Sequence, residues 1–349
     1  MTALTEAIKK VATGPHLSKD LSLNEARLAM LEILSDKADP VQAAIFFIAL
    51  RMKRETKEEN LGILQALQTN TDQVSINVDQ LLTIADPFNG YNRHCPITAF
   101  LPAVLAACGL PTVSQGVKEM GPKFGVTHSQ VLAQAGVKTD LSVQVAAQRL
   151  TDSNVGWTYI DQAQTTPTLH DLQDLRTRMI KRPSLATLEK LIMPIKARGK
   201  THLQIGFVHK AYPEVLAWLA QQAGFSSVLI VRGLEGGIVP TLRETSNCFR
   251  SVAGELTPCV FDPTDFDIHQ DTRGTLPETT DEVTAQHTVE LGLKALEGQS
   301  GPAFDSLVYG GAMVLWHCGL QPSQHQAAQH VRQVIQSGKA KACFELGID

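Results

Sequence analysis

The chain has 349 residues, of which 43% are hydrophobic and 19% charged, and its formal net charge is −4 at pH 7. Single cores seldom grow beyond about 250–300 residues, so this length predicts two domains. The slight negative charge excludes a strong overall attraction to nucleic acid or to anionic membranes, although it is compatible with a local basic face. No stretch is apolar enough to span a bilayer, and the N-terminus lacks the apolar core of a signal peptide, so we expect a cytoplasmic protein with no membrane partner.

Residues 1 to 74 carry the start signals of several helices. Ser22 with Glu25, and Thr56 with Glu59, have the spacing of capping boxes, and Asp39 followed by a proline supplies another helix start. These signals predict a small helical domain.

From about residue 79 the pattern changes to short apolar runs that alternate with helical stretches. This alternation favours an α/β domain with a mainly parallel sheet. The expected strands are residues 81–85, 155–160, 203–208 and 227–231, and a second turn is expected at 114–118. An acid-rich region, 259–280, is expected to be irregular strand and loop, followed by helices near 282–296, 306–319 and up to 337–339.

The loop after the first of these strands is the first candidate site. Thr98 and the backbone around Arg93 lie where a following helix begins, and free N–H donors at a helix start can hold an anion. Asn89, Gly90 and Asn92 fit a ligand role as well as they fit simple turn positions that tolerate positive φ.

A second basic loop follows. Lys118 and Lys123 lie close to Gly116 and Gly125, and a basic loop interrupted by glycines often holds phosphate. The six cysteines form no Cys-x-x-Cys pair and have no histidine at finger spacing, so buried, reduced thiols and no zinc site are expected.

Taken together, these stretches resemble the anthranilate phosphoribosyltransferase family over nearly the whole chain, most clearly at residues 49–59, 109–116 and 335–340. The resemblance implies a helical domain, 1–74, joined by helices within about 168–196 to an α/β domain formed by 75–167 and 197–349. It also implies a homodimer and a ligand site in the cleft between the domains.

The motifs of that family are only partly present. Its Gly-Thr-Gly-Gly-Asp-Gly loop, which holds the pyrophosphate of phosphoribosyl pyrophosphate, matches residues 86–91, where Asp86 and Phe88 would repel or block that group. Only Asn89 and Gly90 remain as contacts there, and the Asn-x-Ser-Thr element keeps only the hydroxyl of Thr98.

The other matches are mixed. Lys123 and Gly125 keep a Lys-x-Gly pair, whereas the asparagine that touches the aromatic acceptor is replaced by Val117. Arg176 and Arg182 match two acceptor-side arginines, although they would also fit an ordinary charged helix face.

The family's two magnesium-binding acids correspond to one carboxylate, Glu235, followed by glycine. Because magnesium is held by carboxylates, waters and substrate phosphates, Glu235 alone is a weak metal candidate, and we expect no cofactor. Residues 91–93 and 232–236 resemble a divergent branch of the family whose members are reported to bind nucleic acid.

The leading hypothesis is therefore a non-biosynthetic homologue that binds an anionic ligand such as DNA or RNA in its cleft. The expected contacts are cationic: Arg93, Lys118, Lys123, Arg176 and Arg182, extended by Arg51, Lys53 and Arg54. The alternative is an active phosphoribosyl or other glycosyl transferase of the tryptophan-biosynthesis type, which would need Mg²⁺ and a rearranged loop. A purely structural or regulatory dimer is the third possibility.

Overall fold

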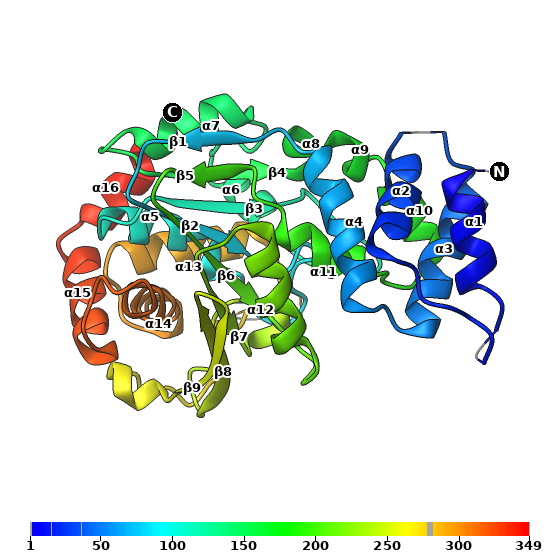
Figure 1. Cartoon of the computed structure of the whole chain (residues 1–349). Coiled ribbons are helices and arrows are strands. Elements are labelled where there is room, and N and C mark those ends of the chain that lie inside the picture. The colour runs from blue at the N-terminus through cyan, green and yellow to red at the C-terminus, as the bar shows by residue number, and fades with distance from the viewer. Residues whose placement is uncertain (1, 15, 36, 278–281, 349) are drawn as a thin grey trace.

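The computed structural model describes residues 2–14, 16–35, 37–277 and 282–348. The chain begins with four helices: α1 (Ala3–Val11), α2 (Leu23–Leu34), α3 (Pro40–Lys53) and α4 (Lys57–Thr69). Both expected capping boxes are present at α2 and α4, and the Asp39 carboxylate accepts the first N–H groups of α3. The four helices form the block at the right of Figure 1.

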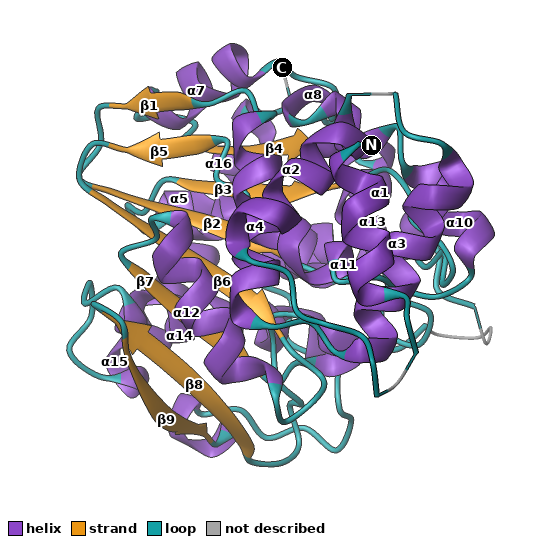
Figure 2. Cartoon of the chain, turned by 45° about the vertical axis from the view of Figure 1, so that its right-hand side comes forward, coloured by secondary structure: helices purple, strands orange, loops and turns teal. Residues whose placement is uncertain are grey.

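A seven-stranded sheet forms the centre of the larger part of the molecule (Figure 2). Five strands are parallel and the last two are antiparallel. Their order is β4 (Trp157–Asp161), β3 (Thr112–Gly116), β2 (Gln80–Ala85), β6 (Lys200–Gly206), β7 (Ser227–Val231), β8 (Ser246–Val252) and β9 (Glu255–Phe261). A separate parallel pair joins β1 (Val74–Ile76) to β5 (Ile195–Ala197). The predicted fold class is therefore confirmed.

Helices cover both faces of the sheet, and the strands have apolar residues on both sides. Val228 and Ile230 belong to the core shared with the helical domain, whereas Leu229 and Val231 face the opposite core. The first core includes α12 (Tyr212–Ala223) and the second is formed by α5 (Leu101–Ala107), α13 (Ala285–Leu296), α14 (Pro302–His317), α15 (Gln324–Gln336) and α16 (Lys339–Leu346).

Shorter elements connect these layers. They are α6 (His128–Gln134), α7 (Val143–Thr151), α8 (Gln162–Thr165), α9 (Pro167–His170), α10 (Gln173–Met179), α11 (Leu185–Leu188) and the 3-10 turns η1 (Ile97–Phe100), η2 (Glu189–Leu191), η3 (Leu234–Gly236) and η4 (Pro263–Phe266). Leu185 and Leu188 of α11 are buried in the core shared with α1 to α4. The exact domain boundaries given above stay predictions.

Two local expectations differ from the structure. Ser114, Gln115 and Gly116 are the end of strand β3 and not a turn, because they pair with β4. Residues 246–261 form an antiparallel hairpin that the sequence pattern did not reveal. The end of the expected irregular region, residues 278–280, lies outside the described residues. Within the described part of the chain, no helix is long and apolar enough to cross a membrane.

A buried chain of polar side chains crosses the sheet. Ser227 Oγ lies 2.7 Å from His202 Nδ1 and 2.7 Å from His317 Nε2, and His202 Nε2 lies 3.0 Å from Gln80 Oε1. Because Gln80 Oε1 can only accept, His202 carries its proton on Nε2, Ser227 donates to His202, and His317 donates to Ser227. His202, which donates from Nε2 and accepts at Nδ1, is therefore neutral in this arrangement.

This network predicts a loss of stability at mildly acidic pH. Burial, reinforced by the positive charges of Lys200 and Arg250, lowers the pKa of His202 to about 4 and that of His317 to about 3. Unfolded histidine titrates near pH 6.5, so the unfolded chain binds more protons as the pH falls from about 6.5 to about 4, and folding is weakened in that window. By about pH 4, the titration of His202 alone is expected to lower the free energy of unfolding by about 3 kcal/mol.

Urea unfolding between about pH 7 and pH 4 measures this loss directly. His317→Gln keeps a donor for Ser227 but cannot titrate, so it should make the dependence of unfolding free energy on pH less steep, with the contribution of His202 remaining. The exposed His16→Gln is the matched control and should leave the dependence unchanged. An equally steep dependence in His317→Gln and in the wild-type protein would contradict the assignment.

Candidate functional site

The loop after β2 is held in place by a buried carboxylate. Asp86 accepts hydrogen bonds from Tyr91 Oη at 2.7 Å and from Thr98 Oγ1 at 2.9 Å, and its Oδ2 lies 2.6 Å from His128 Nε2. Burial alone would raise the pKa of Asp86, but the contact with His128 outweighs it and holds the pKa below its ordinary value. Asp86 and Thr98 therefore fix the loop by bonding to other parts of the same chain.

The histidine in this cluster was given no role by the sequence. His128 begins α6 and also places its Nδ1 3.0 Å from Ser114 Oγ. It lies far from Asp86 along the chain, so no local spacing links the two residues, and only the fold brings them together.

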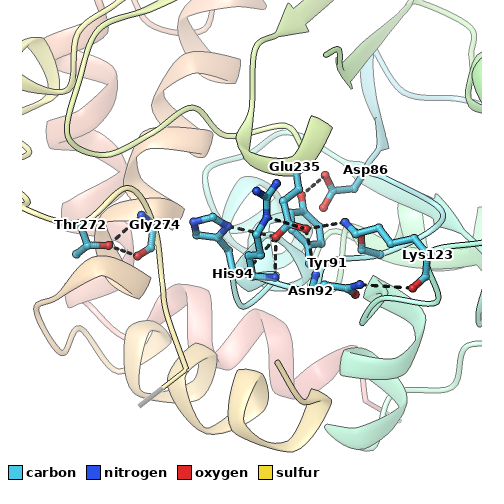
Figure 3. Close-up of polar contacts among 10 residues, drawn as sticks. Asp86, Tyr91, Asn92, His94, Lys123, Glu235, Thr272 and Gly274 are labelled. Atoms are coloured by element: carbon cyan, nitrogen blue, oxygen red, sulfur yellow. Dashed lines mark hydrogen bonds and ion pairs between the residues drawn. The ribbon is translucent and has the colours of Figure 1, made fainter. Parts of the chain in front are cut away.

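A second buried carboxylate, Glu235, reaches the same loop from η3. It accepts backbone N–H groups of Asn92 at 3.1 Å, Arg93 at 2.9 Å and His94 at 3.1 Å, and it lies 2.6 Å from Lys123 Nζ. His94 Nδ1 is a further neighbour at 3.2 Å (Figure 3). We call these three N–H groups and Lys123 Nζ the cradle.

The charge of Glu235 is well compensated in this position. Its side chain is only 2% exposed. Burial alone would raise the pKa of Glu235, but the bonds from His94, Lys123 and the Asn92 N–H outweigh burial and hold the pKa far below its ordinary value. The carboxylate is therefore ionised at neutral pH.

Close backbone contacts keep the loops around the cradle together. A Cβ at Gly90 would lie 2.2 Å from the Gly125 carbonyl oxygen, and a Cβ at Gly237 would lie 1.9 Å from Tyr91 Oη. Tyr91 also forms a β-bridge with Val126. Gly90 and Gly125, both predicted as phosphate contacts, are thus required for the packing of one loop against the other.

Arg176 and Arg182 have different surroundings. Arg176 is buried and forms two hydrogen bonds with Glu189, at 2.7 and 2.9 Å. Arg182 is exposed and donates to the side-chain oxygen of Asn89 at 2.8 Å in the amide orientation that satisfies both groups. Its carbonyl oxygen accepts a hydrogen bond from Arg51. The structure therefore brings Asn89, Arg182 and Arg51 together.

These residues border a cleft of about 440 Å³ between the helical domain and the larger domain. Its lining includes four cations and one carboxylate, the carboxylate being Glu235; the cations are Arg51, Lys181, Arg182 and Lys190. Burial lowers the pKa of Lys190, although the neighbouring Glu189 and Asp86 favour its charged form. The lining also includes apolar and aromatic residues, which are Ile205, Phe207, Val208, His209, Tyr212 and Leu216.

Several other predicted cationic residues do not line this cleft. Lys53 is paired with Glu59 at 2.9 Å and with Asp20 at 2.5 Å, so its charge is already compensated. Lys118 and Arg54 are exposed but do not line the cleft.

Three further predicted residues lie outside the cleft lining. Arg93 is exposed, with Nε 3.9 Å from Glu235, and the Asn92 side chain lies 3.4 Å from the Lys123 carbonyl oxygen. Gly116 is buried at the end of β3.

The residues do not fit a magnesium site. Both oxygens of Glu235 already accept bonds from the cradle, and the next position, where a second acid would be needed, is Gly236. Among the described residues, no group of three or more His, Cys, Asp or Glu side chains could hold a metal ion.

Comparison with known proteins agrees with this architecture. Residues 5–70 match a glycosyl transferase family helical bundle domain, and residues 90–341 match a glycosyl transferase family a/b domain. The anthranilate phosphoribosyltransferase of Rhodococcus opacus is 27% identical over 300 residues, 85% of this chain and 78% of that protein. The enzyme of the same name from Methanobrevibacter smithii is 24% identical over 351 residues, 99% of this chain and 98% of that protein.

Solved structures show the same fold. Anthranilate phosphoribosyltransferase from Saccharomyces cerevisiae, in complex with PRPP and Mg, superposes with a TM-score of 0.81 at 16% identity, covering 99% of this chain and 97% of that chain. The protein of the same name from Thermus thermophilus gives a TM-score of 0.77 at 17% identity, over 100% and 98% of the two chains.

Proposed function

Because the chain belongs to the glycosyl transferase family that includes the anthranilate phosphoribosyltransferases, we propose that it uses the family's interdomain cleft to bind nucleic acid rather than to transfer a phosphoribosyl group. One observation supports this proposal: the cleft is lined by cations, while the donors of the neighbouring cradle are already bonded to Glu235 of the same chain. Arg51, Lys181 and Arg182 are exposed along the cleft, whereas Glu235 uses the donors that a small phosphate ligand would need.

A polymer suits this arrangement better than a small phosphate ester does. Its phosphates repeat along a strand, so several can contact exposed cations at once without entering the cradle. The overall charge of −4 does not oppose this, because salt screens charges beyond about 10 Å and the cleft cations act locally. His209 and Tyr212, which also line the cleft, supply rings on which bases of a single strand can stack.

Binding should fall steeply with salt. If the three exposed cleft cations contact three phosphates of a single strand, affinity should drop roughly twentyfold between about 50 and 200 mM salt. Fluorescence anisotropy with a labelled mixed-sequence oligonucleotide of about 20 nucleotides measures this dependence. Absence of binding to single- or double-stranded DNA or RNA, even at low salt, would overturn the proposed function.

A matched pair of triple variants locates the site. Replacing Arg51, Lys181 and Arg182 by glutamine should weaken binding at least tenfold and reduce the salt dependence. The control replaces Lys196, Arg198 and Lys200, which are exposed, lie outside the cleft lining and carry the same total charge. Equal losses in both variants would contradict binding in the cleft.

We also propose a homodimer formed by the helical domain. An open hollow of about 680 Å³ on α1 and α3 is lined mainly by apolar side chains, and Ile45 and Met52 are 43% and 78% exposed there. Apolar groups in such a patch are stabilised when a second copy covers them.

Light scattering tests the dimer. The wild-type chain should have twice the mass of the 37.9 kDa monomer, and Ile45→Asp with Met52→Asp should yield monomers. Val252→Asp, at an exposed apolar position on β8, is the control and should leave the dimer intact. A monomeric wild-type protein at micromolar concentration would contradict this proposal.

A further inference from the structure

We propose that Glu235 is an internal competitor: its carboxylate occupies, within the same chain, an anion site formed by the cradle, and a phosphate group can enter that site only when the segment 233–237 moves away. The inference concerns the regulation of the proposed cleft. It rests on the proposed function only in treating this cleft as the ligand-binding site that is regulated, and not for the existence of the anion site.

The donors themselves indicate an anion site. Three successive backbone N–H groups, from Asn92 to His94, point at one carboxylate together with Lys123 Nζ and His94 Nδ1. Successive N–H groups that converge with a lysine are a common arrangement for binding phosphate and carboxylate. Glu235 is the acceptor that these three N–H groups share, whereas Lys123 Nζ also donates to the Gly90 carbonyl oxygen.

The backbone conformation of segment 233–237 directs the Glu235 side chain into the cradle. Glu235 itself has φ 54° and ψ 20°, a left-handed conformation that a side chain with a Cβ adopts at a cost. A Cβ at Gly233 would lie 1.9 Å from the Gly237 carbonyl oxygen, and a Cβ at Gly206 would lie 2.0 Å from the Gly236 carbonyl oxygen. Bare backbone on both sides thus permits the tight turn that buries the carboxylate.

The location explains why this contact would regulate the cleft. Glu235 and Gly236 line the cleft, while Lys123 closes the cradle from the opposite loop and also donates to the Gly90 carbonyl oxygen. The Arg93 guanidinium lies at the open side, 3.9 Å from Glu235. A phosphate that displaces the carboxylate would accept hydrogen bonds from the same cradle donors. The released Glu235 side chain would then add a negative charge to the cleft.

Inorganic phosphate is the direct probe. Titration calorimetry should show one phosphate per chain bound by Glu235→Ala at least tenfold more tightly than by the wild-type chain, because the substitution removes the competitor and leaves space. Adding Lys123→Ala to Glu235→Ala should remove the binding again. If Glu235→Ala is folded, as judged by circular dichroism, yet binds phosphate no better than wild type, the inference is wrong.

A second measurement uses the wild-type chain and therefore tests the inference even if Glu235→Ala does not fold. Hydrogen exchange of the wild-type chain is compared in phosphate and in chloride at equal ionic strength. Faster exchange of 233–237 in phosphate, with residues 92–94 still protected, is the expected result, and identical exchange in the two salts contradicts it. Because neither measurement uses nucleic acid, failure of the oligonucleotide experiment and failure of this one can be told apart.

Discussion

Replacing Glu189 by alanine is expected to lower the free energy of unfolding by about 3–5 kcal/mol. The Arg176 guanidinium, only 5% exposed, would then remain buried without its counter-ion. The Gln162 amide, which donates to the same carboxylate at 3.1 Å, would also lose its acceptor. An uncompensated charge costs much more than the pair contributes, because the charge cannot regain its water.

Chemical denaturation of matched variants measures this effect. Asp174→Ala breaks the exposed pair between Arg178 and Asp174, at 3.3 Å, and should cost less than about 1 kcal/mol. The double variant Arg176→Met with Glu189→Leu removes both charges at once and should recover most of the lost stability. A Glu189→Ala protein as stable as Asp174→Ala would contradict the structural role assigned to this ion pair.

Phosphoribosyl pyrophosphate, Mg²⁺ and anthranilate are expected to give no pyrophosphate release above the uncatalysed rate. Enzymes accelerate such reactions by about 10⁶-fold or more, so the absence of that acceleration is a large effect. Two features of the site are the reason. Phe88 packs with Val117 and Met120 at the position where the transferase reaction would need a glycine loop. Glu235 is already bonded to the donors of the cradle.

A coupled pyrophosphate assay across a panel of aromatic acceptors measures this rate. Lys123→Ala provides the control for contaminating activity, since any true turnover in this cleft should need the cation in the cradle. Turnover by the wild-type chain that disappears in Lys123→Ala would support the transferase alternative and contradict the proposed function.

The sequence predicted most of the fold because the signals are local. Capping boxes at Ser22 and Thr56 start α2 and α4, and the apolar run 227–231 coincides with β7. The hairpin β8–β9 was missed because its strands show a mixed pattern of exposure at the edge of the sheet, and because Pro258 is unfavourable in strands away from an edge.

The site was less predictable because its partners are distant along the chain. Asp86 and His128, Glu235 and Lys123, and Arg176 and Glu189 each meet only in the folded protein. The sequence predicted Asn89 as a loop contact and Arg182 and Arg51 as separate cationic contacts, and no spacing indicated that the three lie together, as they do in the structure. Nothing in the spacing around Glu235 indicated that its carboxylate would occupy the donors of the neighbouring loop.

Titration calorimetry of the wild-type chain with phosphoribosyl pyrophosphate and Mg²⁺ is the decisive test of whether this chain fills its own phosphate cradle. The expected result is no saturable binding up to about 1 mM phosphoribosyl pyrophosphate, which is the upper end of ordinary KM values. Stoichiometric binding with a micromolar dissociation constant would show that the cradle accepts the diphosphate despite Glu235, and would contradict internal occupation of the site.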